Sequence, residues 1–230
     1  RMLNFLKKIP LLKEIYRFVW RILCIMSSKV IISNYLKNNK IKKLHLGSGN
    51  HKINGWLNVD IEATSLVAYI DVTKKFSINN EMIDYIFSEH MIEHINHHDG
   101  LKMLNESFRI LKYSGKIRIS TPDLQFLVDL YLDKNNQLKN DYIKWTCKNY
   151  QLNEANVSEV INNFFSSWGH KFIYDKKTIE STLKKAGFTK IEFFKINESN
   201  NAELRNLEND TRLPENFLQL ESLTVEATKL

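Results

Sequence analysis

Short apolar runs, separated by polar segments, recur along residues 41–228. Runs of this kind that end at Gly, Pro, Asn or Asp are typical of buried strands. Helical spacing of apolar residues predicts a helix at residues 100–112, capped by Asp99, and a second at residues 176–186, capped by Asp175. Because strands and helices alternate, we expect a mostly parallel sheet. The seven predicted strands are residues 41–46, 57–60, 67–70, 83–88, 116–120, 191–196 and 223–227.

Residues 124–167 have a helical pattern, with breaks near Asn135 and Asn153. They follow the fifth predicted strand, which is ended by Pro122 because proline donates no hydrogen bond to a strand ladder. A helical insertion at that carboxyl end would cover the ligand crevice of a parallel sheet. The polar connection at residues 197–219 has two interpretations, a loop near the site or a flexible decoration.

The first part of the chain, residues 1–40, is a basic amphipathic extension. Lys13, Arg17 and Arg21 recur at every fourth position, so they share one face of a helix. The opposite face carries Leu12, Ile15, Val19, Ile22, Leu23 and Met26. Charges interrupt the apolar stretch and no cleavage site follows it, so we expect a helix that neither spans a membrane nor is removed. Residues 2–29 would then contact either a membrane surface or a protein surface, the latter on this chain or on a second subunit.

Composition narrows the class of protein. A chain of 230 residues with 43% apolar residues suits one α/β domain, residues 41–230, plus the extension. Cys24 and Cys147 provide neither a disulfide framework nor metal-ligand spacing, which favours a cytoplasmic protein, at the inner face of the membrane if the extension binds lipid. The net charge is +7, but the lysines are scattered among Asn and Ile, so we expect no nucleic-acid partner.

A glycine turn, Gly47-Ser48-Gly49, follows the first predicted strand, and the next strand ends in Asp60. Glycine lets a ligand approach the backbone because it has no Cβ, and a carboxylate at this sheet edge can accept hydrogen bonds from a ribose diol. A dinucleotide fingerprint would have a third glycine and an acid roughly 20 residues on. Asp60 follows Gly49 by eleven positions, so the spacing favours a nucleoside-containing cofactor without a pyrophosphate.

Five segments occur in a fixed order: LHLGSG (44–49), GWLNVD (55–60), SEHMIEH (88–94), FRILKYSG (108–115) and WGH (168–170). Together they resemble class I S-adenosylmethionine-dependent methyltransferases, and more narrowly the small bacterial branch associated with surface-polysaccharide synthesis. The resemblance implies an α/β, Rossmann-like, seven-stranded, mostly parallel sheet whose last strand is antiparallel. The helical insertion after strand 5, at about residues 124–168, and the N-terminal amphipathic helix would be additions to that sheet.

The resemblance also implies S-adenosylmethionine as the cofactor. Gly47 and Gly49 would approach its methionine and ribose parts, and Asp60 would hold the ribose hydroxyls. Asp71 would meet the adenine amino group, and Glu89 would lie near the methionine end. The remaining residues of the expected cofactor site are Leu46, Ser48, Ile61 and Val72. The chain departs from the family pattern at Ser48, often a cysteine, and at Lys112-Tyr113-Ser114-Gly115, which replaces the usual lysine-proline-glycine-glycine turn.

Methyl transfer to a sugar hydroxyl needs a group that removes the hydroxyl proton. His90 and His94 are the first candidates for this base and Asp123 is the next, because each follows a predicted strand at its carboxyl end. His170 better suits substrate orientation. Each of these residues also has a structural interpretation, such as capping or packing. The aromatic residues of the insertion would either stack on a sugar ring or dock the helices.

The string His90-x-x-Glu93-His94 matches the inverted zinc-protease motif. We expect no metal there, because the string straddles a strand-to-helix turn, whereas that chemistry requires ligands on one helical face. Asp123 with Glu93 would be the candidates if the enzyme recruited a divalent cation through carboxylates.

The sequence therefore predicts an enzyme, an S-adenosylmethionine-dependent O-methyltransferase that acts on a sugar or surface glycan in polysaccharide biosynthesis. Two alternatives stay open. One is a non-catalytic partner module with the same fold, and the other is a methyltransferase for a small molecule, a protein or RNA. An open acceptor cavity would favour catalysis, and a blocked cavity would favour the module.

Overall fold

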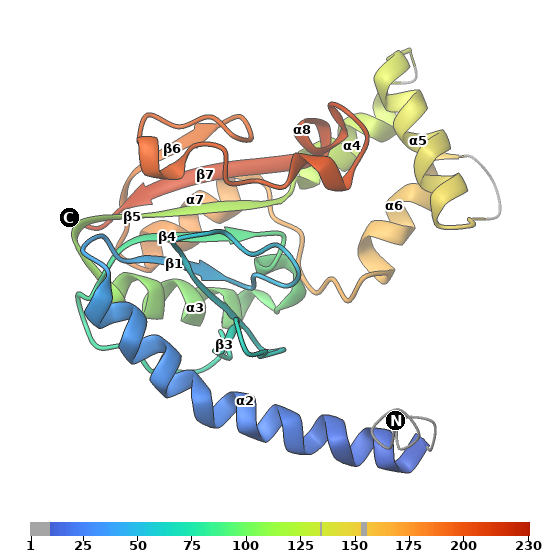
Figure 1. Cartoon of the computed structure of the whole chain (residues 1–230). Helices are drawn as coiled ribbons and strands as arrows, with labels where there is room; N and C mark the ends of the chain where they lie inside the picture. Colours follow the sequence, from blue (N-terminus) through green and yellow to red (C-terminus); the bar gives the residue numbers. More distant parts are fainter. Residues whose placement is uncertain (1–9, 134, 153–155) are drawn as a thin grey trace.

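A seven-stranded sheet forms the centre of the computed structural model, which describes residues 10–133, 135–152 and 156–230 (Figure 1). The strand order is β3-β2-β1-β4-β5-β7-β6, with β7 antiparallel to both of its neighbours and the other pairings parallel. This arrangement confirms the predicted fold class. The strands are β1 (Lys43–Leu46), β2 (Leu57–Asp60), β3 (Ala68–Tyr69), β4 (Ile83–Glu89), β5 (Leu111–Pro122), β6 (Thr189–Phe194) and β7 (Ser222–Thr228).

Helices cover one face of the sheet. Leu44 and Ile86, from β1 and β4, belong to the main apolar core together with Leu104 of α3 and Leu183 of α7. Successive strand residues point to opposite faces, so Phe87 belongs to a separate cluster on the other face. The helices of the described chain are α2 (Pro10–Asn38), α3 (His97–Ile110), α4 (Leu124–Leu132), α5 (Gln137–Asn149), α6 (Val157–Ser166), α7 (Lys176–Lys185) and α8 (Phe217–Glu221), with 3-10 turns η1 (Ile92–His94), η2 (Ala202–Leu204) and η3 (Asp210–Arg212).

The second face is covered by residues 197–219, which sequence alone left as either a site loop or a decoration. Leu204 and Leu207 from this segment pack against Trp56 and Phe87. The segment also contains η2, η3 and the start of α8. It is therefore a packed layer of the domain, because Leu204 and Leu207 reach the sheet and Phe217 reaches the core of the helical insertion.

A buried ion network fixes this layer to the sheet. The Arg118 guanidinium, on β5, donates to Glu208 at 2.7 Å and 3.1 Å and to Glu226 of β7 at 2.7 Å. It also donates to the carbonyls of Glu198 and Lys195. Arg118 is fully buried, so each of these partners offsets the loss of its hydration.

Two local predictions differ from the structure. Asn96, and not Asp99, caps α3, and its side chain accepts a hydrogen bond from the Asp99 backbone. Asn is as good a cap as Asp, and Asp99 accepts a return bond from the Asn96 side chain at 2.8 Å. α3 ends at Ile110, two residues before the predicted end, and residues 112–115 belong to an irregular start of β5, with Ser114 at φ 62° and a shifted register after Ile83.

Only the C-terminal half of α2 is fixed against the sheet (Figure 1). Ile32 is buried in the main core, the Ser28 hydroxyl accepts a hydrogen bond from the Tyr69 backbone at 2.6 Å, and the Tyr35 hydroxyl donates to the Gly55 carbonyl at 2.9 Å. Among the described residues, Phe18–Asn38 is the one helical stretch long and apolar enough to cross a membrane by length and composition. The charged face assigned to Lys13, Arg17 and Arg21 lies outside the side chains that the structure describes.

The helical insertion after β5 has a core of its own. Phe126, Tyr142, Phe164 and Phe217, from α4, α5, α6 and α8, pack together. The insertion lies beyond the carboxyl ends of the parallel strands (Figure 1). It supplies one wall of the site described below.

We predict that Glu208→Ala lowers the free energy of unfolding by about 3 kcal/mol, because it leaves the buried Arg118 charge short of a partner. Urea unfolding measures this change. Glu180→Ala is the matched control, since its ion pair with Lys184 is on the surface, and it should change stability by less than about 0.5 kcal/mol. Equal losses in the two variants would contradict the role of the network.

Candidate active site

The glycine turn and Asp60 meet as the sequence predicts. Gly47 and Gly49 have φ values of 67° and 48°, in the left-handed region that favours glycine. The Gly49 backbone donates to the Asp60 carboxylate at 2.9 Å, and the Glu62 backbone donates to its other oxygen at 2.8 Å. A Cβ on Gly49 would meet no atom within 4 Å. The turn therefore presents an open side directly beside a carboxylate.

Gly47 has a different neighbour. A Cβ at Gly47 would lie 2.2 Å from Cγ of Met91, which belongs to the segment that follows β4. The Met91 side chain thus packs on the first glycine and brings the histidine-bearing segment against the turn. Leu46 and Ser48 are buried, so their side chains support the turn, whereas Ile61 is half exposed beyond Asp60.

The other residues predicted to bind the cofactor have partners within the chain. Asp71 accepts a hydrogen bond from the Thr73 hydroxyl at 2.7 Å and pairs with Lys74 at 2.9 Å. Burial opposes its charge, but these bonds leave the pKa of Asp71 below its ordinary value. Val72 is partly buried against the main core. Glu89 has partners that the sequence did not indicate, described next.

The Glu89 carboxylate joins three parts of the chain. One oxygen lies 3.1 Å from Nδ1 of His51, in the loop after the glycine turn. The other accepts from the Asn209 backbone at 3.0 Å, in the layer over the second sheet face. No motif connects His51 and Asn209 to Glu89 in the sequence. The His51 contact arises because β1 and β4 are neighbours in the sheet, and the Asn209 contact arises because residues 197–219 cover the second sheet face.

A fully buried carboxylate, Glu93, is the centre of the histidine cluster. Its Oε1 lies 3.3 Å from Nδ1 of His90 and 3.9 Å from Nε2 of His94, and its Oε2 accepts from the Thr121 hydroxyl at 3.1 Å. Its backbone carbonyl accepts bonds from the backbone of Lys171 and of Phe172. Burial alone would raise the pKa of Glu93, but the facing His90 ring holds it below its ordinary value. Glu93 is therefore an anion enclosed by imidazoles.

His90 is held in an unusual backbone conformation. Its φ of 44° lies in the left-handed region, where a non-glycine residue is strained. Its Nε2 lies 3.0 Å from the Ser222 hydroxyl, while Nδ1 faces Glu93. This arrangement places the imidazole between a buried carboxylate and a hydroxyl, the geometry of an oriented general base.

His170 reaches the same cluster from the segment after α6. Its Nδ1 lies 2.7 Å from the Phe164 carbonyl, and its ring centroid lies 5.0 Å from that of His94. Burial is the main cause that lowers the pKa of His170, so its ring is neutral near pH 7. The structure thus brings together His90, His94 and His170, which the sequence placed at one sheet edge.

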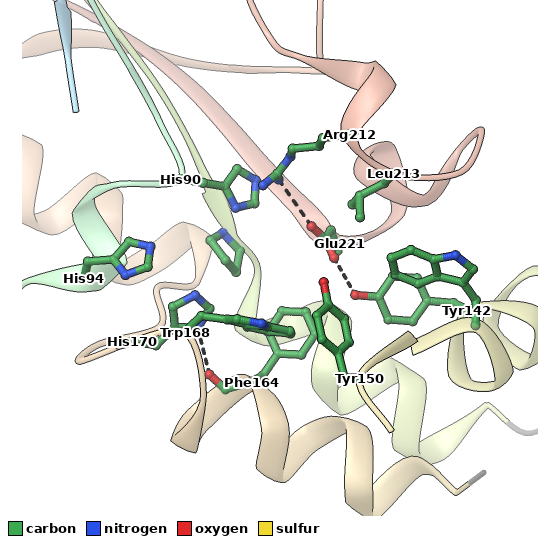
Figure 2. A pocket seen from close by; sticks show the side chains of 12 residues that line it. His90, His94, Tyr142, Tyr150, Phe164, Trp168, His170, Arg212, Leu213 and Glu221 are labelled. Atoms are coloured by element: carbon green, nitrogen blue, oxygen red, sulfur yellow. Dashed lines mark hydrogen bonds and ion pairs between the residues drawn. The ribbon is translucent and has the colours of Figure 1, made fainter. Parts of the chain in front are cut away.

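A cavity of about 200 Å³ opens onto these three histidines (Figure 2). Its aromatic wall comes from the insertion and consists of Tyr142, Trp145, Tyr150, Phe164 and Trp168. Arg212 and Glu221 line the opposite side, 3.4 Å apart, and the Tyr142 hydroxyl donates a short hydrogen bond to Glu221. Sequence reasoning missed Arg212 and Glu221, because no local pattern separates them from other charged residues of a polar connection.

Asp123 lies elsewhere, contrary to the expectation that it shares the edge with the histidines. It caps α4 by accepting from the Gln125 backbone at 2.9 Å. It lines a different cavity, with Lys176, whereas Pro122 is the neighbour that reaches the histidine cavity. Burial is the main cause that raises the pKa of Asp123. The direction in which β5 enters α4 turns its side chain away, and this cannot be read from position along the strand.

Comparisons with known proteins find distant likenesses only. No family model matches the chain, and no curated protein matches it. Among solved structures, a SAM-dependent methyltransferase from Archaeoglobus fulgidus is 16% identical, covers 87% of this chain and 92% of its own, and has a TM-score of 0.47. A putative S-adenosylmethionine-dependent methyltransferase from Listeria monocytogenes is 18% identical over 88% of this chain and 98% of its own, at 0.48. Because these identities and TM-scores are low, the functional proposal made below rests on the sheet order and on the site residues, and not on these similarities.

We predict that Gly47→Ala destabilises the fold more than Gly49→Ala. Both substitutions force a side chain into the left-handed region, which costs roughly 1–2 kcal/mol. Only the first also drives a Cβ into Met91, so its loss of unfolding free energy should be larger by about 1 kcal/mol or more. Urea unfolding of the two variants checks the order. An equal loss would mean that Met91 does not pack on the turn.

Proposed function

We propose that this protein is an S-adenosylmethionine-dependent O-methyltransferase whose acceptor is a hydroxyl of a sugar or surface glycan. The observation that carries the proposal is that His90, backed by Glu93, lines the cavity, while the next residue, Met91, packs on Gly47 of the glycine turn. A nucleoside site and a base beside an acceptor cavity are the two parts that this chemistry needs.

The chain's own residues fit the cofactor at the turn. Gly49 leaves its outer side free, and the Asp60 carboxylate lies beside it to accept the ribose hydroxyls. Asp71, at the end of the neighbouring edge strand, would receive the adenine amino group. When bound, the cofactor supplies an electrophilic methyl group on sulfur. Glu89 shapes the methionine end indirectly, since its oxygens hold His51 and the Asn209 backbone.

His90 acts as the general base. Oε1 of the Glu93 anion faces Nδ1 of His90 at 3.3 Å, which favours the tautomer with the proton on Nδ1 and a lone pair on Nε2. In the free protein that lone pair faces the Ser222 hydroxyl at 3.0 Å. An acceptor hydroxyl in the place of Ser222 would give its proton to Nε2, and its oxygen could then bond to the methyl group as the bond from that methyl to the cofactor sulfur breaks. The buried Glu93 anion then stabilises the imidazolium that forms.

The cavity suits a single sugar ring. Its volume of about 200 Å³ is below the roughly 300–1,000 Å³ of pockets for drug-sized ligands. Trp168 and Tyr150 are partly exposed and lie edge to face, 4.9 Å between centroids, so an apolar sugar face has a surface to contact. Arg212 and Glu221 provide polar partners for hydroxyls or an acidic substituent.

The direct test is to incubate the protein with S-adenosylmethionine and a panel of monosaccharides, nucleotide sugars and oligosaccharides. We expect S-adenosylhomocysteine together with a methylated sugar in mass spectra. Cofactor binding with no product from any member of a broad panel would contradict the assignment of acceptor class.

Two variants separate the assigned roles. His90→Gln should lower kcat about 10²–10⁴-fold, the range of a general base, and leave the Kd for cofactor unchanged. Asp60→Ala should raise the Kd for cofactor at least tenfold, by calorimetry. His98→Gln, an exposed histidine on α3, is the control and should match the wild type. An unchanged kcat in His90→Gln would overturn the base assignment.

A further inference from the structure

We propose that Glu93, His94 and His170 bind one divalent transition-metal cation, such as Zn²⁺, at the floor of the histidine cavity. Metal binding is independent of the methyl transfer, whereas the catalytic use of the metal rests on the proposed function. The three side chains come from η1 and from the segment after α6, which meet only in the folded chain.

The donor atoms already lie together. One carboxylate oxygen of Glu93 and one ring nitrogen from each histidine lie within 4.8 Å of one another. Imidazole nitrogen and carboxylate oxygen form the donor set of many catalytic zinc and non-haem iron sites. A cation would draw these atoms inward by small side-chain rotations, to distances of about 2.0–2.2 Å from the metal.

One carboxylate oxygen of Glu93 is available as a metal ligand. Its side chain is fully buried, and Oε1 has no hydrogen-bond partner in the part of the chain that the structure describes. The contact with His90, at 3.3 Å, does not have hydrogen-bond geometry. A buried carboxylate oxygen without a donor is costly, and a bound cation would satisfy it.

His170 is oriented as metal ligands usually are. Its Nδ1 donates to the Phe164 carbonyl at 2.7 Å, which fixes the tautomer and leaves Nε2 with a lone pair. Metal-bound histidines almost always donate their other ring nitrogen to a carbonyl or carboxylate in this way.

The structure revises the reason for expecting no metal. That expectation assumed that His90, Glu93 and His94 would have to share one helical face. The third donor is instead His170, about 77 positions from Glu93 in the chain. His90 keeps its place between Glu93 and Ser222 and stays available as the base.

Three protein donors leave a coordination position open toward the cavity. A hydroxyl that approaches this position beside His90 would be polarised by the metal as a Lewis acid, and its proton would become easier to remove. The alternative is that the protein groups around Glu93 balance its charge with no metal. The two states respond differently to an added cation.

The probe is Co²⁺ alone, titrated into tag-free, EDTA-treated and dialysed full-length protein without cofactor or acceptor. We expect visible d–d absorption that saturates at one Co²⁺ per chain and is displaced by Zn²⁺. His94→Gln, whose side chain is partly exposed and tolerates replacement, should weaken binding by about tenfold or more. His98→Gln should bind like the wild type.

Two outcomes would overturn the metal site. One is the absence of saturable Co²⁺ binding in folded protein, and the other is equal affinity in His94→Gln and the wild type. Methyl transfer is scored separately: product formation that survives EDTA would remove the catalytic role of the metal but not the transferase. Saturable Co²⁺ binding without any methyl transfer would support the metal site and contradict the proposed function.

A second inference, carried by different observations, concerns the part of α2 that precedes its contacts with the sheet, residues 18–27. We propose that this part lies on an anionic membrane surface. Its exposed apolar residues recur at helical spacing, since Phe18, Ile22 and Met26 are 65%, 42% and 68% exposed. Cys24 and Ser28, on the opposite side, are buried. The helix therefore turns an apolar face away from its own domain, which argues against docking on it.

The distribution of charge along the chain indicates an anionic partner. Residues 1–40 contain nine lysines and arginines and one acid, whereas residues 41–230 contain 24 basic and 25 acidic residues. The positive charge of the chain is thus confined to the extension. Basic residues beside an apolar helical face, with Trp20 among the exposed residues, suit a lipid headgroup layer. Anchoring of Ile32 and Tyr35 to the domain keeps the second half of α2 out of the bilayer.

Flotation with phosphatidylcholine vesicles, with and without phosphatidylglycerol, tests this proposal on the full chain. We expect binding at least about tenfold tighter to the anionic vesicles. The variant Phe18→Ser/Ile22→Ser/Met26→Ser should lose it. The matched control is Leu66→Ser/Tyr113→Ser/Leu132→Ser, which replaces residues of 69%, 71% and 70% exposure elsewhere and should keep it.

Equal flotation of the two triple variants would contradict the proposal that this part of α2 lies on a membrane surface. So would a dimer in sedimentation experiments that the α2 variant abolishes without any vesicle binding, because a second copy would then cover the face. Protein that carbonate at high pH cannot strip from the vesicles would instead indicate a spanning helix.

Discussion

The enclosure of the Glu93 carboxylate is the constraint on which the site depends. A buried anion must be matched by nearby polar groups, and those around Glu93 come from separate parts of the chain. The Thr121 hydroxyl on β5 donates to Oε2, and the rings of His90 and His94, after β4, face Oε1. Its backbone carbonyl also holds the segment that bears His170. The helical insertion is thereby tied back to the sheet, and the histidine cavity forms where it returns.

The second constraint is the layer over the free face of the sheet. Parallel sheets are usually covered by helices on both faces, but here an irregular segment covers one of them. Arg118 holds it from beneath through Glu208, and Glu89 reaches it at Asn209. The same segment provides Arg212 to the cavity. The position of Arg212 in the proposed acceptor site therefore depends on the buried ion network that holds the same segment at Glu208.

The fold and the glycine turn could be predicted because their evidence is local. Apolar runs mark the strands. Gly49 follows β1 and Asp60 ends the adjacent strand β2, so the strand order brings the two together. The orientation of Asp123 and the pairing of Glu93 with His170 could not be predicted, because they depend on how α4 leaves β5 and how the chain returns after α6. The assignment of Asp99 as a cap failed by three residues, since Asn96 was an equally good cap.

The measurement that tests the account most directly is a crystal structure with S-adenosylhomocysteine. The account predicts that Asp60 accepts bonds from the ribose hydroxyls, and that the sulfur points from the glycine turn into the cavity that contains His90. A nucleoside bound away from Asp60, or a sulfur separated from His90 by packed side chains, would contradict it.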